Sequence, residues 1–177
     1  MTSSSAVPLL KHPGPVAPNR RDVLAGRNQK TWRIVLPRHA SLYEGVTVAM
    51  QTMQLRAASL NIERATFSHL RYFLITHTQG AEQVANYTTP VDVDEPTLLV
   101  GAGATVGTNG QGALAIHCHG LAVTQSGRLT GGHLLTEACI LAEDGVAYIS
   151  ALGHMDLVIG VDPEIRTPVF QPSYCEA

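Results

Sequence analysis

From residue 115 to residue 134 the chain reads Ala115-Ile-His117-Cys-His119-Gly-Leu-Ala-Val-Thr-Gln-Ser-Gly127-Arg-Leu-Thr-Gly131-Gly132-His133-Leu134. In a β-strand, side chains at i and i+2 share a face, so His117 and His119 point together while the residue between them points away. The Ser-Gly127 dipeptide is a turn signal between two strand-like segments, which predicts an antiparallel hairpin. A hairpin with its tip near residue 126 places His119 directly opposite His133, with Cβ atoms about 4.5–5.5 Å apart.

The three imidazoles on this face predict a metal site. Each can offer one neutral nitrogen to a shared ion at about 2.0–2.1 Å, which leaves a fourth position open for water or a ligand. Zinc is the expected divalent metal, although nickel, iron and manganese also accept imidazole ligands. The inference depends on register, because a slip of one residue would turn His133 to the other face. The alternative is that these histidines are satisfied by hydrogen bonds in a core or at a subunit contact.

The segments on either side predict one helix and a series of strands. Ser41-Leu-Tyr-Glu44 has the spacing of a capping box, and the apolar stripe after it predicts a long helix from about Leu42 to Ser59. A short strand precedes it, and period-two patterns follow it. The expected strands are Thr31–Leu36, Ile62–Leu70, Tyr72–His77, Gln83–Tyr87, Thr97–Val106, Ala113–Val123, His133–Leu141 and Val146–Leu152.

These elements predict an α+β fold, in which one long helix packs on a largely antiparallel sheet. The length of 177 residues corresponds to one domain, assigned to residues 27–177. Residues 1–26 are expected to form a flexible, basic and proline-rich arm, because residues 1–19 contain four prolines and little that could be buried. Only 15% of the residues are charged, which leaves part of the surface for contacts between subunits.

Charge and cysteine content limit the classes of function. The net charge is −2, so the chain as a whole is not the basic body typical of a protein held to nucleic acid through phosphates. Residues 11–38, however, carry a net charge of +6, and residues 81–177 carry −9. Three cysteines without a Cys-x-x-Cys pair argue against a disulfide framework and favour a reducing cytoplasm. The N-terminus does not resemble a signal peptide, and no apolar run is long enough to cross a bilayer, so no membrane contact is expected.

At the histidines a family resemblance becomes specific. His-x-His, a glycine turn and Gly-Gly-His-Leu resemble the signature of the plants-and-prokaryotes conserved (PPC) domain, which occurs alone in bacteria and archaea and with AT-hooks in plants. The resemblance covers about Arg27 to Phe170. It implies a subunit that assembles as a homotrimer, a metal site at His117, His119 and His133, and a DNA-associated role. Framework positions carried over are Gly127, Gly131 and Gly132.

Two functions therefore stand side by side. The first is a trimeric, metal-binding PPC protein with a DNA-associated or regulatory role, although no AT-hook core of Arg-Gly-Arg-Pro type is present. The alternative is a metal-dependent enzyme of hydrolase or lyase type that acts on a small anionic metabolite. Candidate catalytic residues for the enzyme are Glu137, which lies four residues after His133 in the expected strand and so shares its face, and Arg128 at the hairpin tip, which could bind a carboxylate. A glutamate exposed to solvent or at a subunit contact is the alternative for Glu137.

Overall fold

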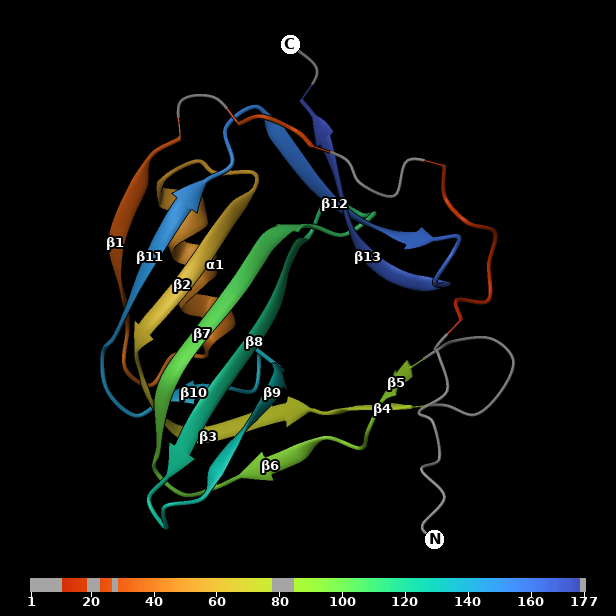
Figure 1. Cartoon of the computed structure of the whole chain (residues 1–177). Helices are drawn as coiled ribbons and strands as arrows, with labels where there is room; N and C mark the ends of the chain where they lie inside the picture. The colour runs from red at the N-terminus through yellow and green to blue at the C-terminus, as the bar shows by residue number, and fades with distance from the viewer. Residues whose placement is uncertain (1–10, 19–22, 27–28, 78–84, 176–177) are drawn as a thin grey trace, which may run out of the picture.

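The computed structural model describes residues 11–18, 23–26, 29–77 and 85–175. One large sheet dominates it, with strand order β1-β11-β2-β7-β8-β9-β3-β10 (Figure 1). The strands are β1 (Thr31–Leu36), β2 (Ala58–Arg64), β3 (Thr66–Phe73), β6 (Val91–Val93), β7 (Thr97–Thr108), β8 (Leu114–Thr124), β9 (Leu129–Leu134), β10 (Ile140–Leu141), β11 (Gly145–Ala151), β12 (Met155–Asp162) and β13 (Thr167–Tyr174), with a separate pair, β4 (Ile75–His77) and β5 (Ala85–Tyr87).

Part of the sheet closes on itself. Strand β7 pairs with β8, β8 pairs with β9, and both β7 and β9 pair with β3. Strand β3 contacts β7 at its start, through Thr66 and Phe67, and β9 at its end, through Tyr72 and Phe73. Strand β3 therefore bridges β7 and β9. Because β7 and β9 are also the two neighbours of β8, this bridge holds the β8–β9 hairpin in place.

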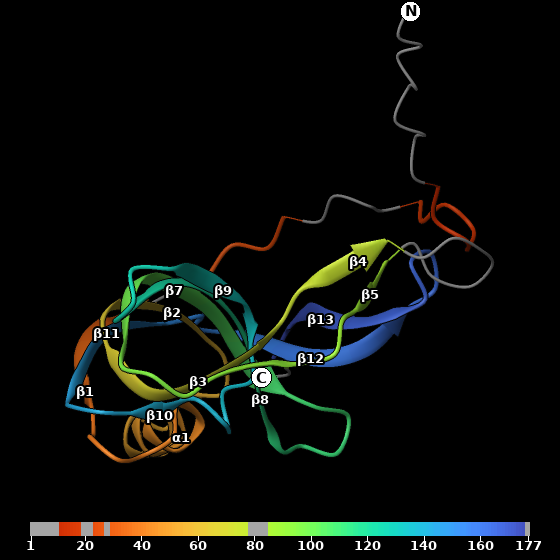
Figure 2. The same cartoon turned by 90° about the horizontal axis from the view of Figure 1, so that it is seen from below.

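The core lies between the inner face of the sheet and the single helix α1 (Leu42–Thr52), which Figure 2 shows on one side of the sheet beside β10. In β2 the residues alternate between buried and exposed, as expected for a strand with one face in the core. Helix α1 contributes an apolar stripe to the same core. The largest fully buried side chains include Phe67, Leu36, Leu42, Ile62, Leu70 and Ile149.

The helix is much shorter than predicted. It begins as expected at the capping box, where the Ser41 hydroxyl accepts from the Glu44 amide at 3.1 Å and the Glu44 carboxylate accepts from the Ser41 amide at 2.7 Å. It ends at Thr52, because Gln54 adopts a left-handed backbone (φ 54°). The Gln54 amide then donates to the carbonyl of Gln51, and that of Leu55 to the carbonyl of Met50. This pattern is a Schellman motif.

The predicted fold class, α+β with one long helix packed on the sheet, is therefore wrong. The structure is a large, mostly antiparallel sheet with one 11-residue helix in the part of the chain that is described. The residues assigned to the last turns of the long helix instead begin strand β2 at Ala58. This helix does not have the length and apolar character needed to cross a membrane, and no other helix occurs among the described residues.

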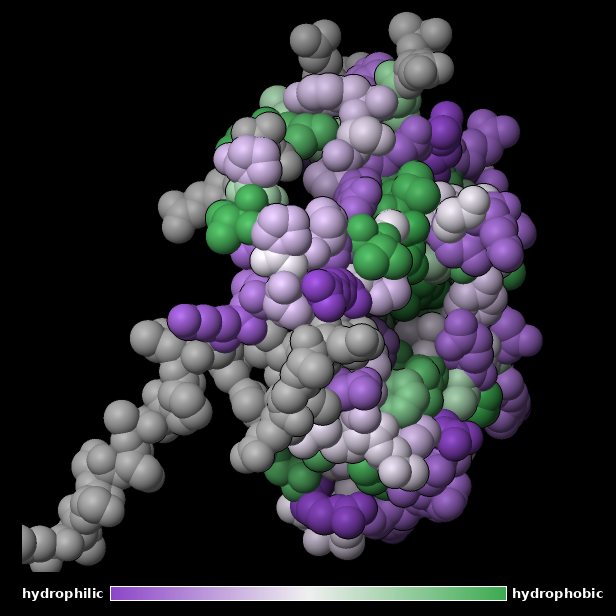
Figure 3. Space-filling view, turned by 90° about the vertical axis from the view of Figure 1, so that its right-hand side faces the viewer, coloured by the Kyte–Doolittle hydropathy of each residue, from purple (hydrophilic) through white to green (hydrophobic). Residues whose placement is uncertain are grey.

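The β12–β13 hairpin extends from one end of the sheet, to which it is joined through a single pairing of Val158 with Thr108. Hydrophobic residues are exposed on this side of the molecule in separate groups among hydrophilic ones (Figure 3). The predicted arm, residues 1–26, lies partly outside the described residues. Its described pieces contact this hairpin: the amides of Gly14 and Ala17 donate to the carbonyl and carboxylate of Glu164, and the amide of Ala25 donates to the Tyr174 hydroxyl.

Two glycines in β9 let the neighbouring strands approach closely. Gly131 and Gly132 have φ values of 139° and 158°, in the region that favours glycine. A Cβ atom at Gly131 would lie 2.2 Å from the carbonyl oxygen of Gly120, and one at Gly132 would lie 2.3 Å from that of Phe73. Both neighbours are backbone atoms of paired strands, so neither can move aside without disturbing the hairpin.

We expect Gly131→Ala to destabilise the protein by about 2–4 kcal/mol, because the methyl group would combine backbone strain with a clash against β8. Gly101→Ala in β7 is the matched control, since no atom lies within 4 Å of its Cβ position. We expect this control to change the free energy of unfolding by less than about 0.5 kcal/mol. Urea unfolding followed by circular dichroism measures both values, and equal losses for the two variants would contradict the close approach.

Candidate metal centre

Two of the candidate ligands lie on the outer face of β8. His117 and His119 are exposed, whereas Cys118 between them is fully buried on the opposite face. The neighbouring strand β7 places Thr105 opposite His117 and Gly103 opposite His119. Since a glycine has no side chain, nothing on β7 covers the His119 ring from that side.

The hairpin brings the third ligand to the same place. His133 is paired directly with His119, the register that the sequence predicts. The ring centroid of His117 lies 4.8 Å from the centroid of each of the other two rings, and the centroids of His119 and His133 are 5.2 Å apart. Nδ1 of His133 lies 3.3 Å from Nε2 of His119, and one ring nitrogen from each of the three residues lies within 4.8 Å of the others.

These distances fit a shared ion. Four ligands at about 2.0–2.1 Å in a tetrahedron are separated from one another by about 3.3–3.4 Å. The closest pair of nitrogens already has this separation. The third can reach it by a small rotation of an exposed side chain, so the donor set can hold a metal that accepts three imidazoles. In the described part of the chain, no other group of three histidine, cysteine, aspartate or glutamate side chains has such spacing.

The electrostatics of the cluster keep two of the rings neutral. Burial, followed by the charges of His117 and His119, lowers the pKa of His133 to about 4. Burial, followed by the charge of His119, also lowers the pKa of His117 below its ordinary value. Because a metal binds the unprotonated ring, protons compete little with the ion at neutral pH.

An aromatic pair lies against the third histidine. The Tyr87 ring is 4.9 Å from that of His133 and stacks on Phe73 at 5.1 Å. The Tyr87 hydroxyl lies 3.3 Å from His133 Nδ1, and partial burial raises the pKa of this phenol. Sequence reasoning missed Tyr87, because it lies 46 residues before His133 and no local pattern connects them.

The two predicted catalytic candidates lie elsewhere. Strand β9 ends at Leu134, so Glu137 belongs to a turn and does not continue the face of His133. Its carboxylate is 3.4 Å from the hydroxyl of the adjacent Thr136. Arg128 is at the hairpin tip, as predicted, and its charge contributes to lowering the pKa of Glu95. The tip is five residues from His133, about 16 Å along the strand, so the structure does not bring Arg128 to the histidines.

A shallow hollow adjoins the histidines. It measures about 530 Å³ and lies on the outer face of strands β2, β7, β8 and β9. Its floor consists largely of glycines, which leave room above the backbone, and His119 and Leu121 border it. A small molecule or a side chain from another subunit could therefore reach the His119 ring from this direction.

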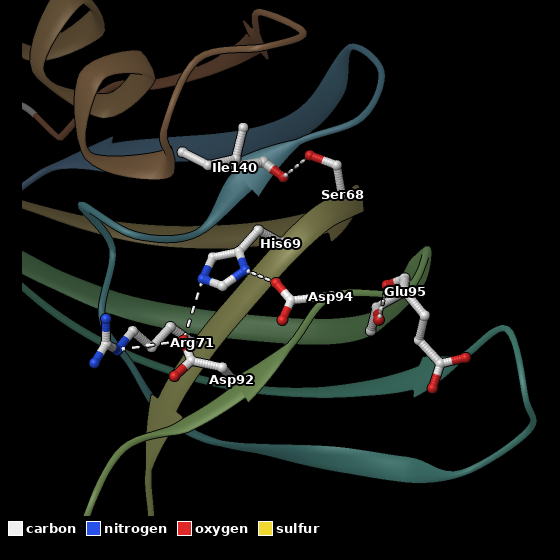
Figure 4. Close-up of polar contacts among 8 residues, drawn as sticks. Ser68, His69, Arg71, Asp92, Asp94, Glu95 and Ile140 are labelled. Atoms are coloured by element: carbon white, nitrogen blue, oxygen red, sulfur yellow. Dashed lines mark hydrogen bonds and ion pairs between the residues drawn. The ribbon is translucent and has the colours of Figure 1, made fainter.

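Another histidine, outside the triad, lies in an ion-pair network. His69 on β3 lies between two carboxylates, with Nδ1 2.6 Å from Asp94 and Nε2 3.2 Å from Asp92 (Figure 4). Arg71 lies 3.4 Å from the same Asp92. Because the carboxylates contact opposite nitrogens of one ring, they do not converge on a common point with it. This cluster is an ion-pair network between β3 and the β6 segment and does not have the form of a metal site.

Comparisons with known proteins show the fold. No protein-family profile matches the chain, and no curated protein does. A metal-containing protein from Archaeoglobus fulgidus has a TM-score of 0.70 and 13% identity, with 85% of this chain and 99% of that chain covered. A plant- and prokaryote-conserved (PPC) protein from Pyrococcus horikoshii has a TM-score of 0.64 and 13% identity, over 80% and 91% of the two chains.

A third structure is named a "putative DNA-binding protein" and comes from Ralstonia eutropha JMP134. It has a TM-score of 0.62 and 18% identity, over 78% of this chain and 89% of that one. At sequence identities of 13–18%, the similarity to these structures shows a shared fold alone. The chain has the fold of a PPC protein, and the resemblance seen in the sequence is confirmed at that level.

The lowered pKa of His133 predicts how stability depends on pH. A histidine whose pKa is lower in the folded state than in the unfolded state allows the greatest stability at pH values where it is neutral in both states. Its contribution is complete above about pH 6.5, the ordinary pKa, and is lost as the pH falls towards about 4. We expect the urea midpoint of metal-free protein to fall between pH 7 and pH 4.5, and to fall less in His133→Gln. An equal fall in both proteins would show that His133 is not the group responsible.

Proposed function

We propose that this chain is a PPC protein that binds one divalent metal ion, zinc in the first instance, through His117, His119 and His133. The observation that carries the proposal is the convergence of three imidazoles from two paired strands, with the closest nitrogens 3.3 Å apart. Neutral rings at physiological pH and a hollow beside His119 support it. The ion would hold the two strands of the hairpin together.

Metal titration tests the proposal. We expect the chain, purified without an affinity tag, to bind one Zn²⁺ per subunit, and His119→Ala and His133→Ala to lower the affinity at least 100-fold. His154→Asn is the matched control: His154 is exposed, and asparagine tolerates its left-handed backbone (φ 63°). Isothermal titration calorimetry measures all four proteins. Full-affinity binding in both triad variants, each folded by circular dichroism, would refute the assignment.

The chain acts, in this proposal, as a homotrimer in a DNA-associated or regulatory role and in the cytoplasm. Exposed apolar residues on the outer face of β7, β8 and β9 support assembly, since they would be buried between subunits. They are Leu98 (55% exposed), Val100 (60%), Leu121 (44%) and Leu129 (63%). Three free thiols support a reducing compartment. The DNA-associated role rests on a fold neighbour so named and on the positive charge of residues 11–38.

Sedimentation of the full chain tests assembly and DNA binding together. The metal-loaded protein should sediment at three times 18.9 kDa. Duplex DNA should bind to it at low salt and dissociate steeply as salt rises, because the contact would consist of cations on phosphates. Charge reversal at exposed Arg33 and Arg38 should weaken binding to every sequence alike. A monomer would refute the trimer, and the lack of any salt-sensitive binding would refute the DNA role.

The alternative is a metal-dependent enzyme that acts on a small anionic metabolite. The exposure of His117 and His119 beside the hollow favours it, because substrate could reach an ion there. Neither Glu137 nor Arg128 lies at the triad, so a general base and an anion-binding group would have to come from other residues or another subunit. Turnover that is lost on chelation, restored by Zn²⁺ and abolished in His119→Ala would favour the enzyme over the regulatory role.

A further inference from the structure

The Tyr87 hydroxyl lies on the metal-facing side of the triad. It is 3.3 Å from His133 Nδ1, and the same nitrogen is 3.3 Å from Nε2 of His119. A residue that supports a ligand histidine from behind contacts the ring nitrogen that does not face the metal. Tyr87 instead contacts the nitrogen that faces the other imidazole, so its oxygen belongs to the group of atoms around the prospective ion.

The length of this contact also indicates a ligand. An O–H group hydrogen bonded to a ring nitrogen is usually closer, at about 2.7–3.0 Å. Two ligands of one tetrahedral ion lie about 3.3–3.4 Å apart. The contact from Tyr87 to His133 and that from His133 to His119 both have this second value, so the phenol oxygen lies at a ligand-to-ligand distance from His133 Nδ1.

The chain holds Tyr87 in this position through several contacts. Its ring stacks on Phe73, the residue of β3 that pairs with His133. The amide of the next residue, Thr88, donates to the carbonyl of Leu74 at 2.9 Å, and the Leu74 amide donates to the Thr88 hydroxyl at 3.1 Å. The end of strand β3 therefore aligns both His133, through β9, and Tyr87, through the segment that follows β5.

We propose that Tyr87 is a fourth protein ligand, which completes an N₃O set with His117, His119 and His133. This inference rests on the proposed metal site. The oxygen would take the position that three histidines alone leave open and would give the ion four protein ligands, as in structural zinc sites. Such a site would join β8, β9 and β5 through one ion.

Copper and zinc binding test the inference. Cu²⁺ binds imidazole sites strongly, and a coordinated phenolate adds a visible charge-transfer band that a site of histidines alone does not give. We expect this band in the wild type and in Tyr148→Phe, a control on β11, and its absence in Tyr87→Phe. Phenylalanine keeps the ring that stacks on Phe73, so a purely structural role of the ring would leave the Kd for Zn²⁺ unchanged. The Kd for Zn²⁺ should rise about 10–100-fold in Tyr87→Phe alone.

The outcomes separate this inference from the metal site itself. Wild-type protein that binds neither ion would overturn both. Binding that requires His119 and His133, but shows no phenolate band and the same Kd in Tyr87→Phe, would leave the triad in place and overturn the role of Tyr87. Circular dichroism of each variant confirms folding, and Tyr87→His offers a second route: an imidazole there should restore Zn²⁺ affinity without the phenolate band.

Discussion

The pairing of β8 with β9 is the constraint on which the site depends. Side chains alternate between the two faces of a strand, so a shift of one residue would turn His133 into the core and bring Leu134 to the surface. The close approach at Gly131 and Gly132 prevents this shift, because any other residue at those points would meet the backbone of β8 or β3. Two residues without side chains thus determine where the third imidazole lies.

The same constraint explains why the hairpin could be predicted from the sequence and other parts could not. The turn at Gly127 and the period of two are local signals, and together they give the pairing of His119 with His133. The end of the helix has no such signal, because Gln54 takes the left-handed position where glycine is typical. The continuation of β9 to Glu137 was wrong because a turn begins after Leu134. Tyr87 reaches the histidines only through the tertiary pairing of β3 with β9, which no short pattern encodes.

Burial and exposure are combined at the histidines in a way that suits metal binding. His117 and His119 stand on a solvent-facing sheet surface, yet the crowding of three rings and partial burial lower the pKa of His117 and His133. A deeply buried triad would also be neutral, but an ion would have to lose all its water to enter. An isolated surface histidine would accept an ion readily and hold it weakly. Three crowded rings at the surface avoid both costs.

The exposed cation on β1 and the histidine triad lie on different strands of the sheet. The outer face of β7, β8 and β9 exposes leucine and valine side chains and glycine backbone. The exposed Arg33 belongs to β1, four strands away from β8, a distance of about 19 Å across the sheet. Under the proposed function, the metal would act on the assembly, at the apolar face where subunits would meet, and the positive segment would make the contact with phosphate.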